Sequence, residues 1–134
     1  MVIFLPGVCN PYAHSDILGI IREIMLNRSS VIVRPKQPYL DWAAQLDDSG
    51  IVPDPNEECT IYLIPEYNDD MQALEILSKC FDVIFEAELD GWCTDESAWP
   101  NKRDFKMFRN WFSFEFYSVV EDLCVYEIID DESV

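Results

Sequence analysis

The chain has 134 residues, with 26 aspartates and glutamates against 9 lysines and arginines, and its formal net charge is −17. Apolar residues make up 49% of the chain and aromatic residues 13%, which excludes a disordered acidic tail and suits one domain with its own hydrophobic core. Because this charge repels phosphate backbones and anionic lipid surfaces, we expect neither nucleic acid nor a membrane as a partner, and we expect attraction to a basic protein.

The sequence lacks the residues that most catalytic and cofactor-binding motifs require. The five cysteines stand far apart without a C-x-x-C pair, His14 is the only histidine, and four glycines leave no phosphate-binding loop. We therefore expect no zinc site, no disulfide framework, no histidine-based triad, no cofactor and no bound metal. No apolar run approaches the roughly 20 residues that cross a bilayer. Together with the scattered cysteines, this favours a cytoplasmic protein.

Residues 1–24 differ from the rest of the chain, and we expect them to form a peripheral N-terminal extension. They combine a short apolar stretch, a turn, and a helix over 17–24 that Ser15 or Asp16 would cap. An alternative is that translation of the native protein begins at Met25, so that the preceding residues are not part of it. In both cases a single α+β domain is expected over 25–134, with a frayed acidic C-terminus.

The first half of this domain has the pattern strand, helix, strand. A β-branched run gives a strand over 30–34, and Pro38 opens a helix that continues to about residue 46. The second strand covers 59–64 and ends at Pro65. This order predicts a right-handed crossover that leaves the two strands parallel.

The longest helix is expected over 69–89. Asp69 and Gln72 form the D-x-x-Q capping pattern at its start, and apolar residues recur every three to four positions along it, so that it should be mostly buried. Gly91 is placed just after its end, where a left-handed backbone costs glycine little.

The last third of the chain is expected to carry a shorter helix and one or two strands. Asn101 to Asp104 offer N-caps for a helix with an aromatic face. Residues 113–120 alternate with the period of a strand, and a helix that continues through Asp122 is the competing interpretation. Residues 126–134 are expected to form a final short strand that frays into an acidic tail.

These elements predict an α+β fold. We expect a single compact domain with a small mixed sheet of three to four strands and three main helices, in the order β-α-β-α-α-β, plus the peripheral N-terminal segment. There is no internal repeat and no linker long enough to divide domains.

The predicted loop between the two later helices is the first place to look for a function. Trp92 and Trp99 flank Thr94, Asp95 and Glu96 there, and a loop tryptophan needs its ring buried or in contact with a partner. The carboxylates suit Mg²⁺ or Ca²⁺, but their spacing is irregular and no calcium-loop pattern is present. The structural alternative is that Thr94 or Asp95 caps a short turn and that Trp92 belongs to the core. Whether Trp99 faces the core or a partner is open.

Arg34 and Lys36 are rare cations in this acidic chain, and they follow the first predicted strand. In a parallel sheet they would lie at the carboxyl end of the strand, where open sheets commonly bind ligands, and could hold a carboxylate or a phosphate. The alternative is an ion pair with a nearby acid such as Glu66 or Asp95.

Four segments of the chain together resemble a family of small uncharacterised bacterial proteins. They read V-x-V-R-P-K-Q-P over 31–38, Y-L-I-P-E over 62–66, G-W-x-T-D-E-S-x-W-P over 91–100 and W-F-x-x-E-x-x-S-x-V-x-D-L over 111–123. The resemblance extends over about residues 27–123. It implies a bacterial source, and it carries over no activity, cofactor or catalytic residue.

We therefore expect a non-enzymatic protein-binding module whose negative charge attracts a basic partner. Its candidate contact residues are Trp92, Thr94, Asp95, Glu96, Trp99, Arg34 and Lys36. The alternative is a small enzyme, either dependent on carboxylates and Mg²⁺ or binding an anion through Arg34 and Lys36. A third possibility is that the acidic face mimics nucleic acid.

Overall fold

A computed structural model describes residues 20–131 of the chain, and it describes side chains from Met25 onward. The chain divides into two compact units. One runs from Arg28 to Ser118, and the other is formed by the segments before and after it. Of the described elements, the larger unit contains the three helices and three of the strands.

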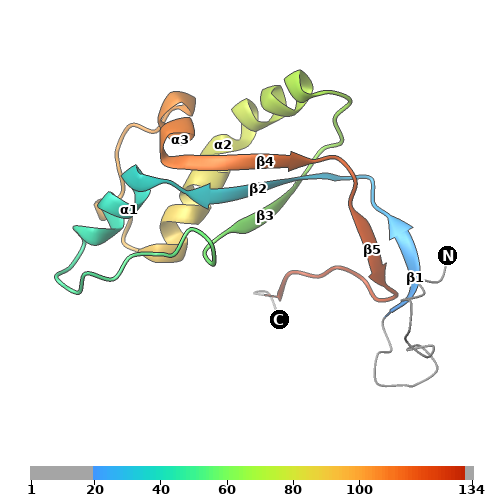
Figure 1. Ribbon diagram of the computed structural model, residues 1–134, viewed down its shortest axis with the longest axis horizontal. Coiled ribbons are helices and arrows are strands. Elements are labelled where there is room, and N and C mark those ends of the chain that lie inside the picture. The colour runs from blue at the N-terminus through green and yellow to red at the C-terminus, as the bar shows by residue number, and fades with distance from the viewer. Residues whose placement is uncertain (1–19, 132–134) are drawn as a thin grey trace. The chain divides into compact units, whose positions relative to one another are not determined.

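The larger unit is built on a three-stranded sheet (Figure 1). Its strands are β2 (Ser29–Pro35), β3 (Thr60–Ile64) and β4 (Phe112–Tyr117), and their order across the sheet is β3-β2-β4. Both neighbours run antiparallel to β2, with Ile32 opposite Ile61 on one side and Glu115 on the other. The β-branched strand is therefore the central one.

The predicted parallel pairing of β2 and β3 is wrong. The helix between them, α1 (Gln37–Ala44), has 8 residues and spans only about 12 Å at 1.5 Å per residue, roughly half the length of a seven-residue strand. It lies at the end of the sheet where β2 ends (Figure 1), so the chain does not return along the sheet before β3 begins. β3 therefore runs back antiparallel to β2.

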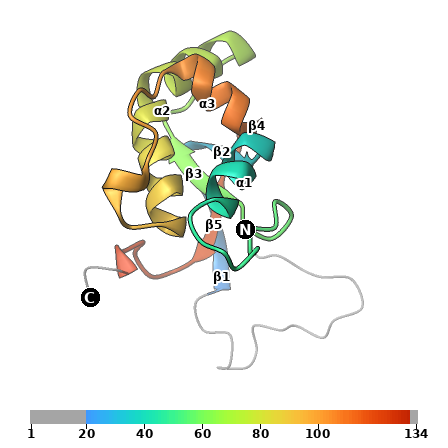
Figure 2. The ribbon, with the colours of Figure 1, turned by 90° about the vertical axis from the view of Figure 1, so that its left-hand side faces the viewer.

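The long helix α2 (Asp70–Trp92) covers one face of the sheet, whereas α1 and α3 (Phe105–Trp111) lie at the end where β2 ends and β4 begins (Figures 1 and 2). The Asp69 carboxylate accepts a hydrogen bond from the backbone N–H of Gln72 at 2.8 Å. The side-chain oxygen of Gln72 accepts one from the backbone N–H of Asn68 at 2.7 Å. The predicted capping of α2 by Asp69 is confirmed.

The predicted end of α2 at Gly91 is wrong. Gly91 lies inside the last turn of the helix and has no positive φ. The helix ends at Trp92, and the backbone N–H of Cys93 donates to the carbonyl oxygen of Leu89 at 2.8 Å. The Trp92 ring packs against the hydrophobic core, and this packing favours the extra helical residues over a glycine stop.

The hydrophobic core lies between α2 and the covered face of the sheet. Val31 and Val33 of β2 are completely buried there, as is Phe85 of α2. The Phe85 and Phe112 rings meet edge to face at 5.2 Å, and Phe108 lies 5.1 Å from Phe112, both measured between ring centroids. Aromatic packing thus joins α2, α3 and β4.

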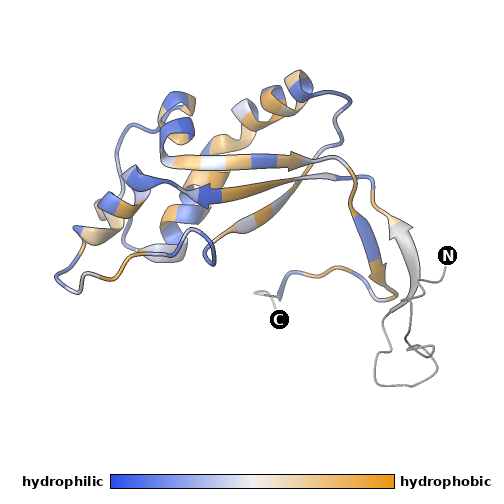
Figure 3. Ribbon diagram, viewed as in Figure 1, coloured by the Kyte–Doolittle hydropathy of each residue, from blue (hydrophilic) through white to orange (hydrophobic). Residues whose placement is uncertain are grey.

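The alternation predicted for the strand after α3 is confirmed. Hydrophobic and hydrophilic residues alternate along β4 (Figure 3), and the phenylalanines face the core. The competing helix through Asp122 is wrong. The larger unit therefore has the predicted α+β fold, with three helices, a three-stranded sheet and the order β-α-β-α-α-β.

The smaller unit contains β1 (Ile20–Met25) and β5 (Glu121–Cys124), which pair antiparallel. The helix predicted over 17–24 is therefore wrong for its described part, where isoleucines favour a strand once a partner strand is present. The final strand predicted over 126–134 is also wrong for its described part, because residues 126–131 form no strand and the ladder to β1 lies earlier, at Glu121–Cys124.

Residues 1–19 and 132–134 lie outside the described residues. The predicted caps Ser15 and Asp16 fall in this part of the chain. The peripheral extension over 1–24 and the domain start at 25 stay predictions. Within residues 20–131, no helix combines the length and the apolar character needed to cross a membrane.

Candidate functional site

The predicted tryptophan loop is a turn that is fastened to the core, named the Trp turn (93–99). It contains a single 3₁₀ turn, η3 (Glu96–Ala98). The Trp99 ring is buried, with 9% of the residue exposed, and its indole N–H donates to the carbonyl oxygen of Cys93 at 2.7 Å. Trp99 therefore faces the core, which answers the question left open by the sequence.

The polar residues of the Trp turn are exposed, and one of them has a clear structural role. Asp95 accepts hydrogen bonds from the backbone N–H of Ser97 at 3.0 Å and from its hydroxyl at 2.7 Å. These bonds lower the pKa of Asp95 and cap η3, as the sequence alternative predicts. Thr94 and Glu96 are exposed beside it.

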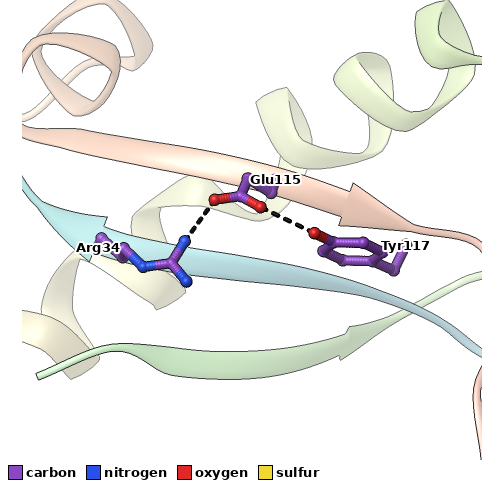
Figure 4. A network of polar contacts seen from close by, with 3 residues as sticks. All are labelled: Arg34, Glu115 and Tyr117. Carbon is purple, nitrogen blue, oxygen red and sulfur yellow. Dashed lines mark hydrogen bonds and ion pairs between the residues drawn. The ribbon is translucent and has the colours of Figure 1, made fainter. Parts of the chain in front are cut away.

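Arg34 forms an ion pair, but with a different acid from those predicted. Its Nη1 lies 2.5 Å from Oε1 of Glu115 on β4, and the Tyr117 hydroxyl donates to Oε2 of Glu115 at 2.9 Å (Figure 4). The hydrogen bond to Glu115 raises the pKa of Tyr117. Glu66 and Asp95 are not its partner, because the antiparallel register places β4 beside Arg34.

The predicted site residues do not gather in one place. The Nζ of Lys36 donates to the backbone carbonyl oxygen of Arg109 at 3.1 Å. The cation beside Trp99 is Arg103, whose guanidinium carbon lies 5.8 Å from the centroid of the ring. Trp92 is half-buried at the end of α2. Both predicted cations are therefore engaged in structural contacts, and neither contact is with the Trp turn.

The sheet face opposite α2 carries apolar residues that sequence reasoning did not single out. We name this surface the open face; its residues are Ile32, Arg34, Ile61, Leu63, Glu115 and Tyr117. Ile61 is 63% exposed, Leu63 47% and Tyr117 50%. Alternation within 59–64 was the available signal, since neighbouring strand residues point to opposite faces.

A half-buried carboxyl group on α2, that of Glu88, is not among the candidate contact residues predicted from the sequence. The hydroxyls of Thr60 and Tyr62 donate to Oε2 of Glu88 at 3.0 and 2.7 Å, and the Tyr39 hydroxyl donates to the backbone carbonyl oxygen of Glu88 at 2.5 Å. Burial raises the pKa of Glu88. Burial, together with the Glu88 carboxylate, raises the pKa values of Tyr39 and Tyr62. Such a carboxyl group can take up a proton or hold a cation.

Glu88 lines a pocket of about 140 Å³, named the Glu88 pocket. Its lining residues are Pro35, Tyr39, Pro53, Glu57, Glu58, Cys59, Thr60, Glu88, Gly91 and Trp92. It therefore includes one predicted site residue, Trp92, in surroundings that the sequence did not indicate. The only sequence signal was an acid among the apolar positions of a helix predicted to be mostly buried.

The described part of the chain contains no group of side chains suited to bind a metal ion. Among the side chains that the structure describes, from Met25 onward, no three His, Cys, Asp or Glu residues lie close enough together to hold a metal ion. The site therefore adds no ligand and no activity to what the sequence motifs imply. No protein-family model, curated protein or solved structure matches the chain.

Proposed function

We propose that the protein is a non-enzymatic cytoplasmic module that binds a basic partner protein. The observation that carries this proposal is the open face, where Ile61, Leu63 and Tyr117 are each about half exposed or more on one side of a small sheet. Clustered apolar side chains on a folded surface are favoured where a partner covers them. The contact is therefore assigned to the open face, because the ring of Trp99 is buried.

The rows of side chains across the sheet give this surface its continuity. The ladders place Ile61 opposite Ile32, and they place Leu63 and Tyr117 on either side of Ser30. Adjacent strands lie about 4.8 Å apart, so residues in one row contact each other. The Arg34–Glu115 ion pair borders the apolar residues on the same face (Figure 4). An apolar centre with a polar margin is typical of a binding surface.

The exposed edge of the sheet favours a partner that binds through an extended segment. β3 lies at the edge and, within the described residues, pairs with β2 alone. Its outer backbone N–H and C=O groups suit an added strand, which would continue the open face beside Ile61 and Leu63.

Charge supports a basic sequence for that segment. Glu57 and Glu58 precede β3, Glu66 follows it, and all three are exposed. The whole chain has a formal charge of −17. A basic strand would meet carboxylates at both ends of β3, and the long-range field would speed its approach.

The enzyme alternative draws less support from the geometry. Arg34 is paired with Glu115, and Lys36 is bound to a backbone carbonyl oxygen. The two cations therefore do not form a common site for an anion. We therefore favour binding over anion-dependent catalysis.

The experiment is capture followed by a measured affinity. The immobilised full chain is used to capture proteins from native cells, and the dissociation constant of a captured basic protein is measured with purified components. Ile61→Thr with Leu63→Thr keeps β-branched or strand-compatible side chains while removing apolar contact. We expect this double variant to bind about tenfold more weakly or worse.

The matched control is Val83→Thr, which changes an apolar residue of α2 that is 66% exposed and lies outside the open face. It should leave the affinity unchanged. Higher salt should slow association, since the charge attraction is screened. An affinity that survives the double variant, or capture that yields no basic protein, would contradict the proposal.

A further inference from the structure

The Glu88 pocket is a second surface feature, on the other side of β3 from the open face. Thr60 and Tyr62 of β3 point toward Glu88 on α2, whereas Ile61 and Leu63 point away from it. The pocket lies where the last turns of α2 meet the start of β3 and the loop before it. Its ligand is therefore a question separate from the open face.

The hydrogen bonds hold the Glu88 carboxylate in one orientation and leave one of its oxygens available. Both hydroxyl donors, Thr60 and Tyr62, contact Oε2. Oε1 has no hydrogen-bond partner among the described residues. Every fully buried side-chain nitrogen or oxygen in that part of the chain has a hydrogen-bond partner, so Oε1 is not fully buried. Oε1 is therefore accessible from outside the protein and free to accept a hydrogen bond from a ligand.

The walls of the pocket select the charge of that ligand. Glu57 and Glu58 line the pocket together with Glu88, the charge of Glu58 helps to raise the pKa of Glu88, and no lysine or arginine is among the lining residues. An anion would be repelled, whereas a cation would offset the cost of holding the Glu88 charge away from water. Tyr39 and Trp92 also line the pocket, and aromatic faces attract ammonium and guanidinium groups.

The size of the pocket limits the ligand to a small group. At about 140 Å³ it is well below the roughly 300–1,000 Å³ of sites for drug-sized molecules. A nucleoside does not fit, and a charged head group on a short aliphatic stem does.

We propose that the Glu88 pocket binds one organic cation, an alkylammonium or guanidinium group that hydrogen-bonds to Oε1 of Glu88 and packs against Tyr39 and Trp92. The group is carried either by a free small amine or by a lysine or arginine side chain. The open face and the pocket share no side chain, although Glu57 and Glu58 line the pocket and also lie beside the β3 edge.

The test is an NMR titration of the isotope-labelled full chain. The ligands are butylammonium, butylguanidinium and the neutral analogue butanol, together with N-acetyl-lysine methylamide, which carries the same ammonium group on a peptide unit. We expect the cations to shift the amide signals of Gly91 and Trp92 and to bind about tenfold more tightly than butanol. Tighter binding of the lysine derivative than of butylammonium identifies a partner side chain, and equal binding of the two identifies a free amine; either result supports the site provided that butylammonium binds more tightly than butanol.

Two variants separate the carboxylate from the general negative field. Glu88→Gln keeps the shape and the acceptor for Thr60 and Tyr62, and it should reduce cation binding to the level of butanol. Asp90→Asn removes the same charge two residues later on α2 from an exposed residue that does not line the pocket, and it should change the affinity by no more than about twofold.

Three results would overturn the proposal. They are equal binding of butanol and butylammonium by the unaltered chain, cation-induced shifts that persist in Glu88→Gln, and the absence of shifts at Gly91 and Trp92 with every cation. The comparison with butanol needs no variant, so it decides the matter even if Glu88→Gln does not fold. The open-face double variant Ile61→Thr with Leu63→Thr should bind the cations normally, which keeps the two proposals distinguishable.

Discussion

The indole N–H of Trp42 donates a hydrogen bond to the carbonyl oxygen of Ala98, with 2.9 Å between the nitrogen and the oxygen. Trp42 lies on α1, and Ala98 ends η3, so this bond ties the Trp turn to a helix 56 residues earlier in the chain. The Trp99 indole N–H closes the same turn on Cys93. Two ring donors thus satisfy two backbone carbonyls, and the turn becomes part of the core.

Replacing Trp99 by alanine should destabilise the fold strongly. The ring is buried and carries a hydrogen bond, so Trp99→Ala is expected to lower the free energy of unfolding by about 3–5 kcal/mol. Trp99→Phe keeps much of the apolar surface and loses the donor, with an expected cost of about 1–3 kcal/mol. Urea unfolding of the full chain, followed by circular dichroism, measures both. An alanine variant as stable as the parent would mean that the ring is not part of the core.

Replacing Glu88 by glutamine should change how stability depends on pH. Burial raises the pKa of Glu88 in the folded state, and repulsion from Glu58 adds to this. At pH values between the pKa of Glu88 in the unfolded state and its higher pKa in the folded state, the folded state binds more protons than the unfolded state. The stability of the protein therefore falls as the pH rises through the folded-state pKa. Glu88→Gln lacks that loss and should gain stability relative to the parent as pH rises from acid to neutral.

The matching measurement is urea unfolding of both proteins across that pH range. Asp82→Asn, which removes an exposed acid from the same helix, is the control for net charge. A constant stability difference between Glu88→Gln and the parent at all pH values would show that the carboxyl group is not held in a buried site.

Removing the N-cap of α2 should cost a modest amount of stability. The Asp69 carboxylate accepts the backbone N–H of Gln72 at 2.8 Å, and Asp69→Ala leaves this donor without its partner. The expected loss is about 1 kcal/mol, within the range of about 0.5–2 kcal/mol for such caps. Asp82→Ala, in the middle of the same helix, should cost less. The change should appear in the urea midpoint and not in the slope of the transition.

The Arg34–Glu115 ion pair should contribute little to stability. The two side chains are 32% and 51% exposed, so water and salt screen their attraction. A double-mutant cycle with Arg34→Gln and Glu115→Gln should give a coupling free energy below about 1 kcal/mol. It should fall further at high salt. A larger, salt-independent coupling would show that the pair is shielded from solvent.

Local signals were sufficient for the starts of α2, η3 and α3. The cap at Asp69 was visible as D-x-x-Q, and Asp104 caps α3 by accepting the backbone N–H of Met107 at 2.8 Å. Asp95 caps η3 through Ser97. Each of these contacts joins residues two or three positions apart, so the sequence contains all of the information.

Strand direction and helix length depended on contacts that the sequence does not list. The parallel prediction for β2 and β3 assumed that α1 crosses the sheet, whereas the short helix stays at its end. Gly91 had the residue type of a helix stop, but the packing of Trp92 against the core extends α2 past it. In both cases tertiary packing outweighed a local preference.

The candidate site shows the same limit. The alternation of Thr60 and Tyr62 with Ile61 and Leu63 was visible, but it does not say which side α2 covers. Only the packing places the two hydroxyl groups on Glu88 and leaves the two aliphatic side chains exposed. The direction of Trp99 likewise follows from its contact with Cys93 and not from the spacing of the tryptophans.

The position of Glu115 has a consequence for the behaviour of concentrated protein. β4 is an edge strand with phenylalanines at 112, 114 and 116, a composition that favours pairing with the same strand of another molecule and growth into aggregates. Glu115 puts a carboxylate in the middle of this run, and edge-to-edge pairing would bring two such charges into one ladder. We therefore expect the carboxylate, even with Arg34 beside it, to disfavour edge-to-edge pairing of separate copies, while the core-facing side of the strand stays apolar.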